Sequence, residues 1–515
     1  MFATLSTLAT VCTLALVVVI SNVIGKRTRN KPLPPGPKPI WPIGNLHQIP
    51  WGNSTAEVYG QWGKIYGPLV YFRTFGREFV VINTLKAALD LFEKRSHLYA
   101  TKPRLVMAGE LVGKDKSSLV FFKYNSLWKD CRRITHSWMA KPSIQGSGPS
   151  LELNADKLLL TFLETPQEFA QYIRSYTATA LLSVLYGIEC STKDDPLIKL
   201  SERVSLLTSE AMRPGRWLCD SFPWMAYVPS WFPGGYFKCW AMEARRASDD
   251  LLHIPYERVK ASVIEGRAKK SWVADSMLDE TGQLIDGEDS HTLMISAGSL
   301  YAAGIDTASI MTASALRTFL LVMTRHPEIQ KKAQEEIDSV VGKDRLPTLS
   351  DRDSLPYVEC VIKEVLRFAA VAALMPHSLD EDDIYNGYTI PKGAWVMVNA
   401  WSIFYDPALY PEPREFRPER FLSTGDHEAE TDPYTVAFGF GRRACAGTPF
   451  VQAWLFLNMA RVLSVFNISP VTGKGIPPAN FVMRHIRIPA EFECSMVPRS
   501  TEKVKLLHHD VLAAP

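Results

Sequence analysis

Near its C-terminus the chain reads Phe438-Gly439-Phe440-Gly441-Arg442-Arg443-Ala444-Cys445-Ala446-Gly447. One cysteine thus lies in a glycine-rich turn, and glycines let a backbone turn sharply and approach a flat ligand closely. Nearby positive charge and unpaired backbone N–H groups favour the thiolate, the form that binds metals. The following Thr448-Pro449 is typical of a helix start, which adds a positive dipole end toward the sulfur. The stretch predicts a metal ligand at Cys445; a buried free cysteine beside a turn is the alternative.

The composition is that of a globular protein with a large core. Of the 515 residues, 46% are hydrophobic and 22% are charged. A net charge of +3 gives no strongly basic field, so nucleic acid is not an expected partner. The eight cysteines are scattered without a Cys-x-x-Cys pair, which argues against a disulfide scaffold or zinc module and for a reducing compartment.

The N-terminal segment has the pattern of a membrane anchor. Residues 2–25 carry no charged side chain, and about 22 such residues make a helix of about 33 Å, enough to cross a bilayer. Basic residues follow at once within residues 26–31, whereas the first acidic residue is Glu57. The basic flank should stay on the cytoplasmic side. We expect an uncleaved transmembrane helix over residues 1–25; the alternative, a cleaved signal peptide, needs a basic start and a shorter apolar stretch.

Residues 26–45 form a basic and proline-rich linker that includes Pro32-Leu33-Pro34-Pro35-Gly36-Pro37-Lys38-Pro39. Polyproline geometry makes such a segment a semi-rigid spacer. No clear linker divides the rest, so we expect one catalytic domain over residues 46–515.

Hydrophobic periodicity predicts a mainly α protein with small β-sheets. Residues 69–72 and 78–82 are typical of a hairpin, and short β-prone pieces such as 394–398 follow later. Residues 141–150, rich in Pro, Gly and Ser, are predicted to be a loop. An aromatic-rich stretch over 212–237 is a pocket lid, a second membrane-contact surface or ordinary core. Helical patterns cover residues 84–94, 126–139, 151–164, 169–186, 242–269, 289–323 and 327–341.

The spacing Phe-x-x-Gly-x-Arg-x-Cys-x-Gly, read here from Phe438 to Gly447, resembles the haem-binding loop of cytochrome P450 enzymes. The resemblance extends over essentially the whole chain. It implies the cytochrome P450 fold, preceded by one N-terminal transmembrane helix. It also implies that Cys445 is the ligand of the iron of haem b (iron protoporphyrin IX), and that Phe438, Arg443 and Gly447 contact the haem.

A second motif places Glu364 and Arg367 three residues apart, on one helix face. Alone, such a pair is usually an exposed surface contact worth little. Its position upstream of Phe416-Arg417-Pro418-Glu419-Arg420-Phe421 resembles the P450 core. That resemblance implies a buried triad of Glu364, Arg367 and Arg420 that braces the haem loop, a role suited to bidentate arginine.

A third motif, Ala303-Gly304-Ile305-Asp306-Thr307, interrupts a long apolar helix. Gly weakens a helix and the Thr hydroxyl can hydrogen-bond back to the backbone, so a bulge there could admit water. The alternative is that Thr307 only caps its own helical turn. The segment resembles the P450 oxygen-binding segment, which implies that Thr307 and Asp306 are catalytic, as hydroxyl donor and proton relay. Ala303 would leave room above the haem. Ala308 stands where the family often has Thr or Ser.

Further residues match haem-contact positions of the family. Trp128 and Arg132 share a helix face at i and i+4, and resemble the Trp-x-x-x-Arg element that holds a haem propionate. His377 and Arg443 are implied as other propionate contacts. Where the family usually has proline after the helix Glu-x-x-Arg, this chain has an apolar strip, residues 369–373, which we expect to face the substrate.

Overall the sequence is most similar to fungal secondary-metabolism P450 monooxygenases, of the O-methylsterigmatocystin oxidoreductase kind. The implied reaction inserts one atom of O2 into a C–H bond of a small hydrophobic substrate, in terpenoid, polyketide or indole biosynthesis. A thiolate-haem isomerase or dehydratase that acts without a reductase is one alternative, and a non-catalytic haem-binding membrane protein is another. The retained Asp306 and Thr307 argue against the isomerase.

The chain has no flavin or nucleotide fingerprint, so electrons should come from a separate NADPH–cytochrome P450 reductase. Lys129, Arg133 and Arg442 are candidates for a basic docking face toward that acidic partner, or are simply solvated charges. The implied location is the endoplasmic reticulum membrane, single-pass, with the body in contact with membrane lipid and the catalytic domain in the cytoplasm.

Overall fold

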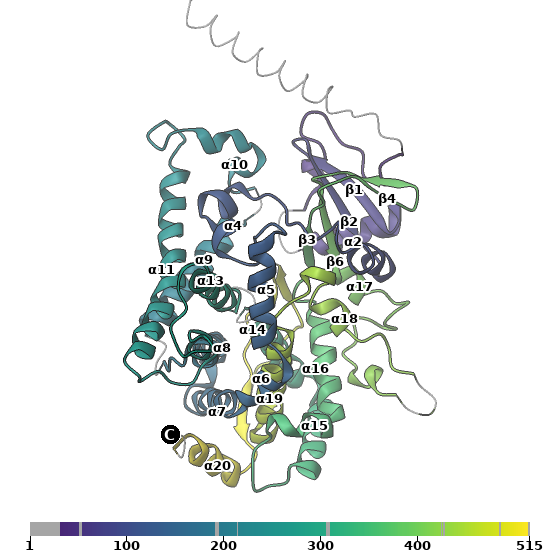
Figure 1. Ribbon diagram of the computed structural model, residues 1–515. Helices are drawn as coiled ribbons and strands as arrows, with labels where there is room; N and C mark the ends of the chain where they lie inside the picture. Colours follow the sequence, from purple (N-terminus) through teal and green to yellow (C-terminus); the bar gives the residue numbers. More distant parts are fainter. Residues whose placement is uncertain are drawn as a thin grey trace, which may run out of the picture.

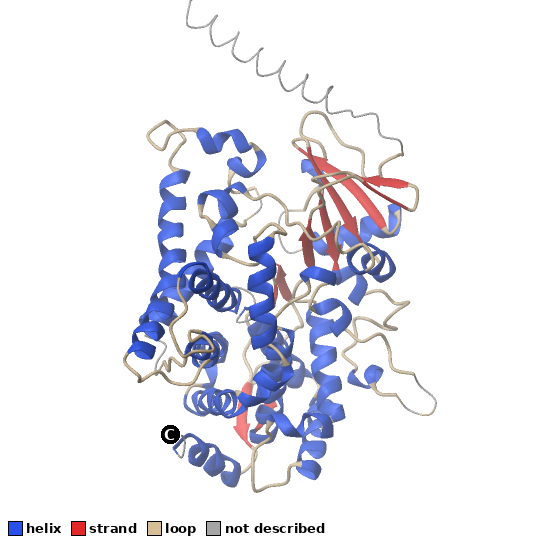
Figure 2. Cartoon of the chain, in the orientation of Figure 1, coloured by secondary structure: helices blue, strands red, loops and turns tan. Residues whose placement is uncertain are grey.

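The computed structural model describes residues 31–50, 54–190, 195–213, 215–304, 310–423, 425, 428–483 and 486–512. The described chain is mainly helical, with most strands gathered at one end of the molecule (Figure 1, Figure 2). The predicted class, mainly α with small sheets, is therefore confirmed. Within these ranges no helix is both long and apolar enough to cross a membrane, and the predicted anchor over residues 1–25 lies outside them.

The longer helices pack around a common centre and the shorter ones connect them. In the first half of the chain the helices are α2 (Thr55–Tyr66), α3 (Leu85–Ala88), α4 (Lys114–Ser117), α5 (Ser126–Trp138), α6 (Lys141–Gly146), α7 (Gly148–Glu164), α8 (Phe169–Tyr186), α9 (Pro196–Ala211), α10 (Leu218–Ser221) and α11 (Phe237–Ile264). In the second half they are α12 (Trp272–Ser276), α13 (Gly287–Ala303), α14 (Ile310–Arg325), α15 (Pro327–Val340), α16 (Pro356–Ala369), α17 (Ala400–Phe404), α18 (Tyr434–Ala437), α19 (Thr448–Val465) and α20 (Thr501–Leu512). Short 3-10 or π turns are η1 (Leu46–Gln48), η2 (Leu89–Glu93), η3 (Val106–Leu111), η4 (Pro166–Glu168), η5 (Pro223–Tyr227), η7 (Leu349–Ser354), η8 (Pro418–Phe421) and η9 (Gly441–Arg443).

The main sheet has the strand order β1-β2-β6-β3. The predicted hairpin is confirmed as antiparallel β1 and β2, in which Leu69 pairs with Ile82. β6 joins β2 in parallel, and β3 closes the sheet antiparallel to β6 with His377 opposite Val396. Two-stranded sheets pair β10 with β7, β4 with β5, and β8 with β9. The strands are β1 (Leu69–Thr74), β2 (Arg77–Ile82), β3 (Leu374–His377), β4 (Asp383–Tyr385), β5 (Tyr388–Ile390), β6 (Trp395–Asn399), β7 (Phe466–Ser469), β8 (Phe481–Met483), β9 (Arg487–Pro489) and β10 (Ser495–Pro498).

The predicted loop over residues 141–150 is wrong. Residues 141–146 form α6, and α7 begins at Gly148. In each helix a proline, Pro142 or Pro149, occupies the first turn, where its missing N–H breaks no hydrogen bond and its fixed φ suits a helix. Proline in the first turn begins a helix, whereas proline in the interior of a helix breaks it.

α19 is the buried centre of the molecule and begins directly after the cysteine loop. Nearly all of its residues from Phe450 onward are buried, in keeping with a helix that is apolar on every face. Trp454 packs in one large core cluster with residues of α8 and α13, and Leu455 packs in another with residues of α14 and α16. Because α19 is fixed on all sides, its N-terminus gives the cysteine loop a rigid support.

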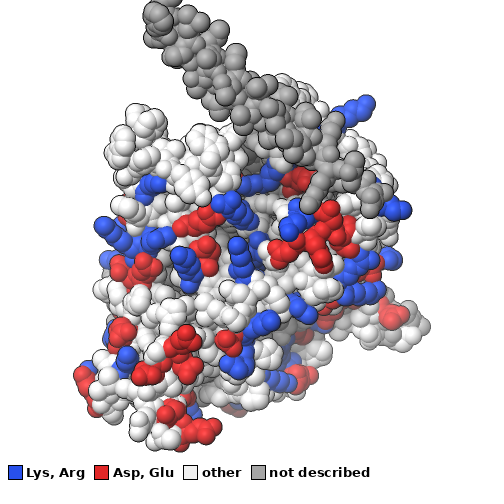
Figure 3. Space-filling model, turned by 45° about the horizontal axis from the view of Figure 1, so that its top comes forward, with Lys and Arg blue, Asp and Glu red and all other residues white. Residues whose placement is uncertain are grey.

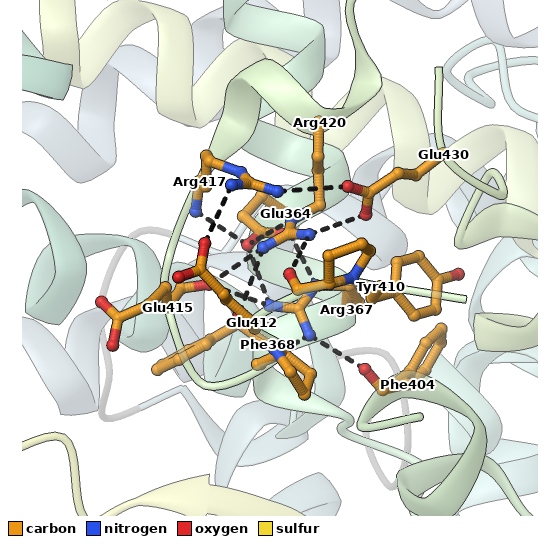
Figure 4. Close-up of polar contacts among 12 residues, drawn as sticks. Glu364, Arg367, Phe368, Phe404, Tyr410, Glu412, Glu415, Arg417, Arg420 and Glu430 are labelled. Carbon is orange, nitrogen blue, oxygen red and sulfur yellow. Dashed lines mark hydrogen bonds and ion pairs between the residues drawn. The ribbon is translucent and has the colours of Figure 1, made fainter. Parts of the chain in front are cut away.

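The predicted triad is present and fully enclosed (Figure 4). Side chains of Glu364, Arg367 and Arg420 have 0% exposure. Arg367 donates to both oxygens of Glu364, at 2.7 and 2.9 Å, and Arg420 Nε donates to Oε1 at 3.2 Å. One carboxylate is therefore shared by two guanidinium groups, and Glu430 gives Arg420 a second counter-charge at 2.7 Å.

The same arginines also hold the chain segment that leads to the cysteine loop. Arg367 donates to the carbonyls of Phe404 and Pro413, each at 2.9 Å. Arg420 donates to Glu430 at 2.7 Å and to the carbonyl of Pro411 at 3.0 Å. The triad thus fastens residues 404–423, and with them Glu430, to α16.

Replacing Glu364 with Gln should strongly destabilise the fold, because Arg367 loses its paired carboxylate and Arg420 loses one of its two, in a site that water cannot reach. We expect the free energy of unfolding to fall by about 3–5 kcal/mol, measured by urea unfolding followed by circular dichroism. Glu335→Gln is the control, since Glu335 pairs with Lys331 on an exposed surface and should change stability by about 0.5 kcal/mol or less. Equal stabilities of the two variants would contradict the structural role of the triad.

Candidate functional site

The cysteine loop is closed by its own backbone. The N–H of Cys445 donates to the carbonyl of Phe438 at 2.8 Å, and the N–H of Ala444 donates to Gly441 at 3.0 Å. Downstream, the hydroxyl of Thr448 donates to the carbonyl of Cys445 at 3.0 Å. These bonds hold Cys445 between η9 and the first turn of α19, as the sequence predicted for a turn followed by a helix start.

Gly441 explains why the loop needs glycine. Its φ of +53° lies in the left-handed region, and an added Cβ would lie 2.0 Å from the carbonyl oxygen of Phe92. Its N–H also donates to Glu93 at 2.7 Å. A larger residue here would push the loop away from η2, so this glycine sets how closely the loop packs against the body.

The surroundings of the Cys445 thiol act on its pKa in both directions. The side chain is accessible, yet enclosure by protein raises the pKa of its thiol. The N–H groups of Gly447 and Thr448 and the charge of Arg132 act in the opposite direction, toward a lower pKa. The positive charge that most lowers this pKa is that of Arg132, on α5. A thiol that coordinates a metal ion is deprotonated by the metal itself.

The residues predicted to contact propionates do converge beside the cysteine loop. Arg132 donates to the carbonyl of Ala444 at 2.7 Å, which joins α5 directly to the loop. The guanidinium of Arg443 lies 4.5 Å from the ring centre of the buried Trp128. Arg443 itself donates to three backbone carbonyls, those of Ala100, Leu119 and Phe122. Burial and the neighbouring Arg132 lower the pKa of Arg443 to about 10.

His377, at the end of β3, is neutral and firmly held. Its side chain is 4% exposed, and its Nδ1 lies 3.0 Å from the carbonyl of Tyr99. The ring of Phe92 meets it edge-on, with centroids 4.6 Å apart. Burial, followed by the positive charge of Lys102, lowers the pKa of His377 well below its ordinary value.

Lys102 is a member of this cluster that the sequence analysis missed. Its Nζ donates to the carbonyl of Pro376 at 3.1 Å. Burial, together with the like charge of Arg443, lowers its pKa to about 7. No periodicity or motif in the sequence singles out this lysine, because its neighbours come from β3 and from the cysteine loop. We call four neighbouring side chains the cationic cluster: Lys102, Arg132, His377 and Arg443.

A small apolar cavity adjoins the loop. Phe438 lines it, as predicted, and the N–H of Cys445 is bonded to the Phe438 carbonyl. Gly447 borders the sulfur, since a Cβ added there would lie 3.8 Å from Sγ. Ala303 ends α13 and lies outside the lining. The cavity is lined by Met311, Thr312, Ala315, Leu366, Val371, Ala372, Phe404, Ala437, Phe438, Val451 and Leu455.

The predicted catalytic pair, Asp306 and Thr307, lies outside the described residues. The described chain resumes at Ile310, and the next turn of α14 supplies Met311 and Thr312 to the cavity wall. The roles of Asp306 and Thr307 therefore stay predictions.

The residues present fit an iron porphyrin. The thiol of Cys445 is accessible, an apolar cavity adjoins its loop, and four nitrogen-bearing side chains lie together beside the loop. Cys445 would hold the iron, the apolar walls would contact the macrocycle, and the cationic cluster suits its carboxylates.

Comparison with known proteins agrees with this arrangement. The sequence model of the family "Cytochrome P450" matches residues 34–493. The chain is 38% identical to cytochrome P450 monooxygenase 208 of Postia placenta, over 98% of each protein. It is 36% identical to cytochrome P450 monooxygenase claR of Ampulloclitocybe clavipes, over 98% of this chain and 94% of that protein. It is also 36% identical to tryptamine 4-monooxygenase of Psilocybe cyanescens, over 93% of this chain and 96% of that protein.

Haem retention should depend on pH through Lys102. A bound carboxylate would restore the ordinary pKa of this lysine, so binding takes up a proton above pH 7. Haem affinity should then fall as pH rises from about 7 toward 10, by up to about tenfold per unit. The measurement is the rate of haem transfer to apomyoglobin across this range.

Lys102→Arg should flatten the profile, because arginine stays charged throughout. The exposed Lys116→Met is the control and should keep the wild-type slope. A Lys102→Arg profile as steep as that of the wild type would argue against Lys102 as a carboxylate contact.

Proposed function

Because the chain belongs to the cytochrome P450 family, whose curated relatives are monooxygenases, we propose that it inserts one atom of O2 into a C–H bond of a small hydrophobic molecule. The observation that carries this proposal is the accessible Cys445 sulfur, beside an apolar cavity and a cationic cluster. When bound, haem b supplies the activation of O2 and the oxidising chemistry.

The chain's own residues then have separate tasks. Cys445 donates electron density as the thiolate ligand, and the cationic cluster orients the cofactor through its carboxylates. Thr307 offers a hydroxyl and Asp306 relays protons from solvent, as the family pattern implies. The apolar cavity walls exclude water and hold a hydrophobic substrate.

The substrate class that we propose is a fungal secondary metabolite of terpenoid, polyketide or indole type. The apolar lining supports a hydrophobic molecule, and the relatives named above are fungal proteins. One relative is named tryptamine 4-monooxygenase, and tryptamine is an indole. At 36% identity, that name supports the broad class and not the individual substrate.

The electron donor that we propose is NADPH–cytochrome P450 reductase. Exposed basic side chains lie on the surface near the cysteine loop: Lys129 and Arg442 each lie 5.3 Å from the ring centre of Tyr124. Arg133, on the same helix as Lys129, is also exposed, although Asp130 pairs with it at 3.2 Å. This basic surface suits an acidic flavoprotein.

The body is proposed to contact membrane lipid next to a single-pass anchor in the endoplasmic reticulum. Bulky aromatic side chains in and after η5 are exposed, among them Trp224 at 61%, Tyr227 at 85% and Trp231 at 81%. The projecting segment around α10 is largely free of charged side chains in Figure 3. In Figure 1 it lies at the same end of the molecule as the first described residues. Trp and Tyr favour the membrane–water interface.

The function is tested by reconstitution with the reductase, NADPH and isotopically labelled O2. With terpenoid, polyketide and indole scaffolds as trial substrates, one labelled oxygen atom should enter the product only when NADPH is present. Cys445→Ala should lose the ferrous–CO absorbance shift of a thiolate haem, and Thr307→Ala should divert electrons to peroxide.

Each alternative function gives a different result. Product formed without NADPH would identify an isomerase or dehydratase. A normal haem spectrum without substrate-dependent NADPH consumption would identify a non-catalytic haem protein. An unchanged CO shift in Cys445→Ala would refute the ligand assignment.

Membrane contact is tested by sedimentation with phosphatidylcholine–phosphatidylserine vesicles. Deleting residues 1–25 should release much of the protein, and Trp224→Ser with Trp231→Ser should release most of the remainder. Ile264→Ser, which changes an exposed apolar residue at the far end of α11, is the control and should have no effect. Sedimentation that neither the deletion nor the tryptophan changes alter would contradict the proposal.

A further inference from the structure

Arg487, the first residue of β9, joins three elements through its backbone and side chain. Its N–H donates to the carbonyl of Val371 at 2.9 Å, and its carbonyl accepts from the hydroxyl of Ser314 at 2.7 Å. Val371 follows α16 and Ser314 lies on α14. One residue of the β8–β9 hairpin therefore fixes the distance between α14 and the chain that leaves α16.

The side chain strengthens this junction at the end of α16. Its Nη1 donates to the carbonyls of Phe368 and Ala369, at 2.9 and 2.7 Å. These are the last residues of the helix, where carbonyls lack partners within the helix and a positive charge is favourable. The guanidinium also lies 3.8 Å from the ring centre of Phe481 and 5.6 Å from that of Tyr405.

The junction lies directly behind the cavity beside Cys445. α14 contributes Met311 to the lining, and the chain after α16 contributes Val371. A small buried cluster of Ala369, Val371 and Ile486, packed against Met311, connects the two walls. A shift of the strip 369–373 relative to α14 would change the shape of the cavity.

We propose that Arg487 is a positioning residue that fixes the cavity wall formed by residues 369–373, and so sets which apolar substrates the cavity accepts. The proposal rests on the proposed function, since it assumes that this cavity serves the haem reaction. Arginine suits this place because Nη1 donates to two carbonyls while the planar group lies against two aromatic rings. Lysine offers a single point charge in place of that planar group.

The test compares Arg487→Met and Arg487→Lys with the control Arg325→Met in the full-length haem protein. Arg325 is also half-buried and donates to one backbone carbonyl, that of Pro477 at 2.6 Å, but it ends α14 away from the cavity. The probes are imidazole and the bulkier 4-phenylimidazole, whose binding shifts the Soret band. Hydrogen exchange of the peptide over residues 366–376 measures the wall directly.

In Arg487→Met, imidazole affinity should stay within about twofold of wild type, while 4-phenylimidazole affinity changes by about tenfold or more, equivalent to about 1.4 kcal/mol. Exchange over residues 366–376 should accelerate in this variant and not in Arg325→Met. Arg487→Lys should fall between Arg487→Met and wild type, and it remains informative if Arg487→Met does not retain haem.

Two results overturn the proposal. One is a change in 4-phenylimidazole affinity that is equal in Arg487→Met and Arg325→Met. The other is hydrogen exchange over residues 366–376 that is the same in Arg487→Met as in wild type. Failure of the proposed function is a separate result, because the wild type would then show no ferrous–CO shift of a thiolate haem. If the wild type shows that shift and the Arg487 variants have no effect, only the role of Arg487 is refuted and the proposed function stands.

Discussion

The interaction on which the structure most depends is the sharing of one enclosed carboxylate, Glu364, by two enclosed guanidinium groups. Water reaches none of the three side chains, so the charges must be balanced within the protein. Other N–H groups of the two arginines donate to the backbone carbonyls of Phe404, Pro411 and Pro413 and to the carboxylate of Glu430. The chain between α17 and η8 is thereby given one defined path toward the cysteine loop.

From this constraint follows the geometry of the site. The loop is bounded on one side by η2, which Gly441 allows it to approach, and on the other by the fully buried α19. The thiol of Cys445 is therefore presented by a support that cannot easily move. The two walls of the neighbouring cavity are then joined to each other through Arg487, which bonds to the end of α16 and to α14.

Much of this arrangement could be predicted from sequence, and the reasons differ by residue. Cys445, Phe438 and Gly447 belong to one local pattern, and Glu364 with Arg367 has helical spacing. Lys102 and Arg487 could not be found in this way, because their partners lie far along the chain and their own neighbours show no periodicity. Arg132 was found as part of a helix pattern, but its bond to Ala444, 312 residues away, was not. Prolines 142 and 149 misled the prediction because proline both ends helices and begins them.

The cationic cluster has a consequence for how the protein is made. Residues 102, 132, 377 and 443 come from distant parts of the chain, and the pKa values of Lys102, His377 and Arg443 are each lowered in part by a neighbouring positive charge. Repulsion among Lys102, Arg132 and Arg443 opposes their assembly until an anionic group lies among them. A porphyrin dianion that binds only the folded chain would relieve this repulsion and stabilise the fold by mass action. The yield of folded protein in a cell should therefore follow the supply of haem as closely as it follows the rate of translation.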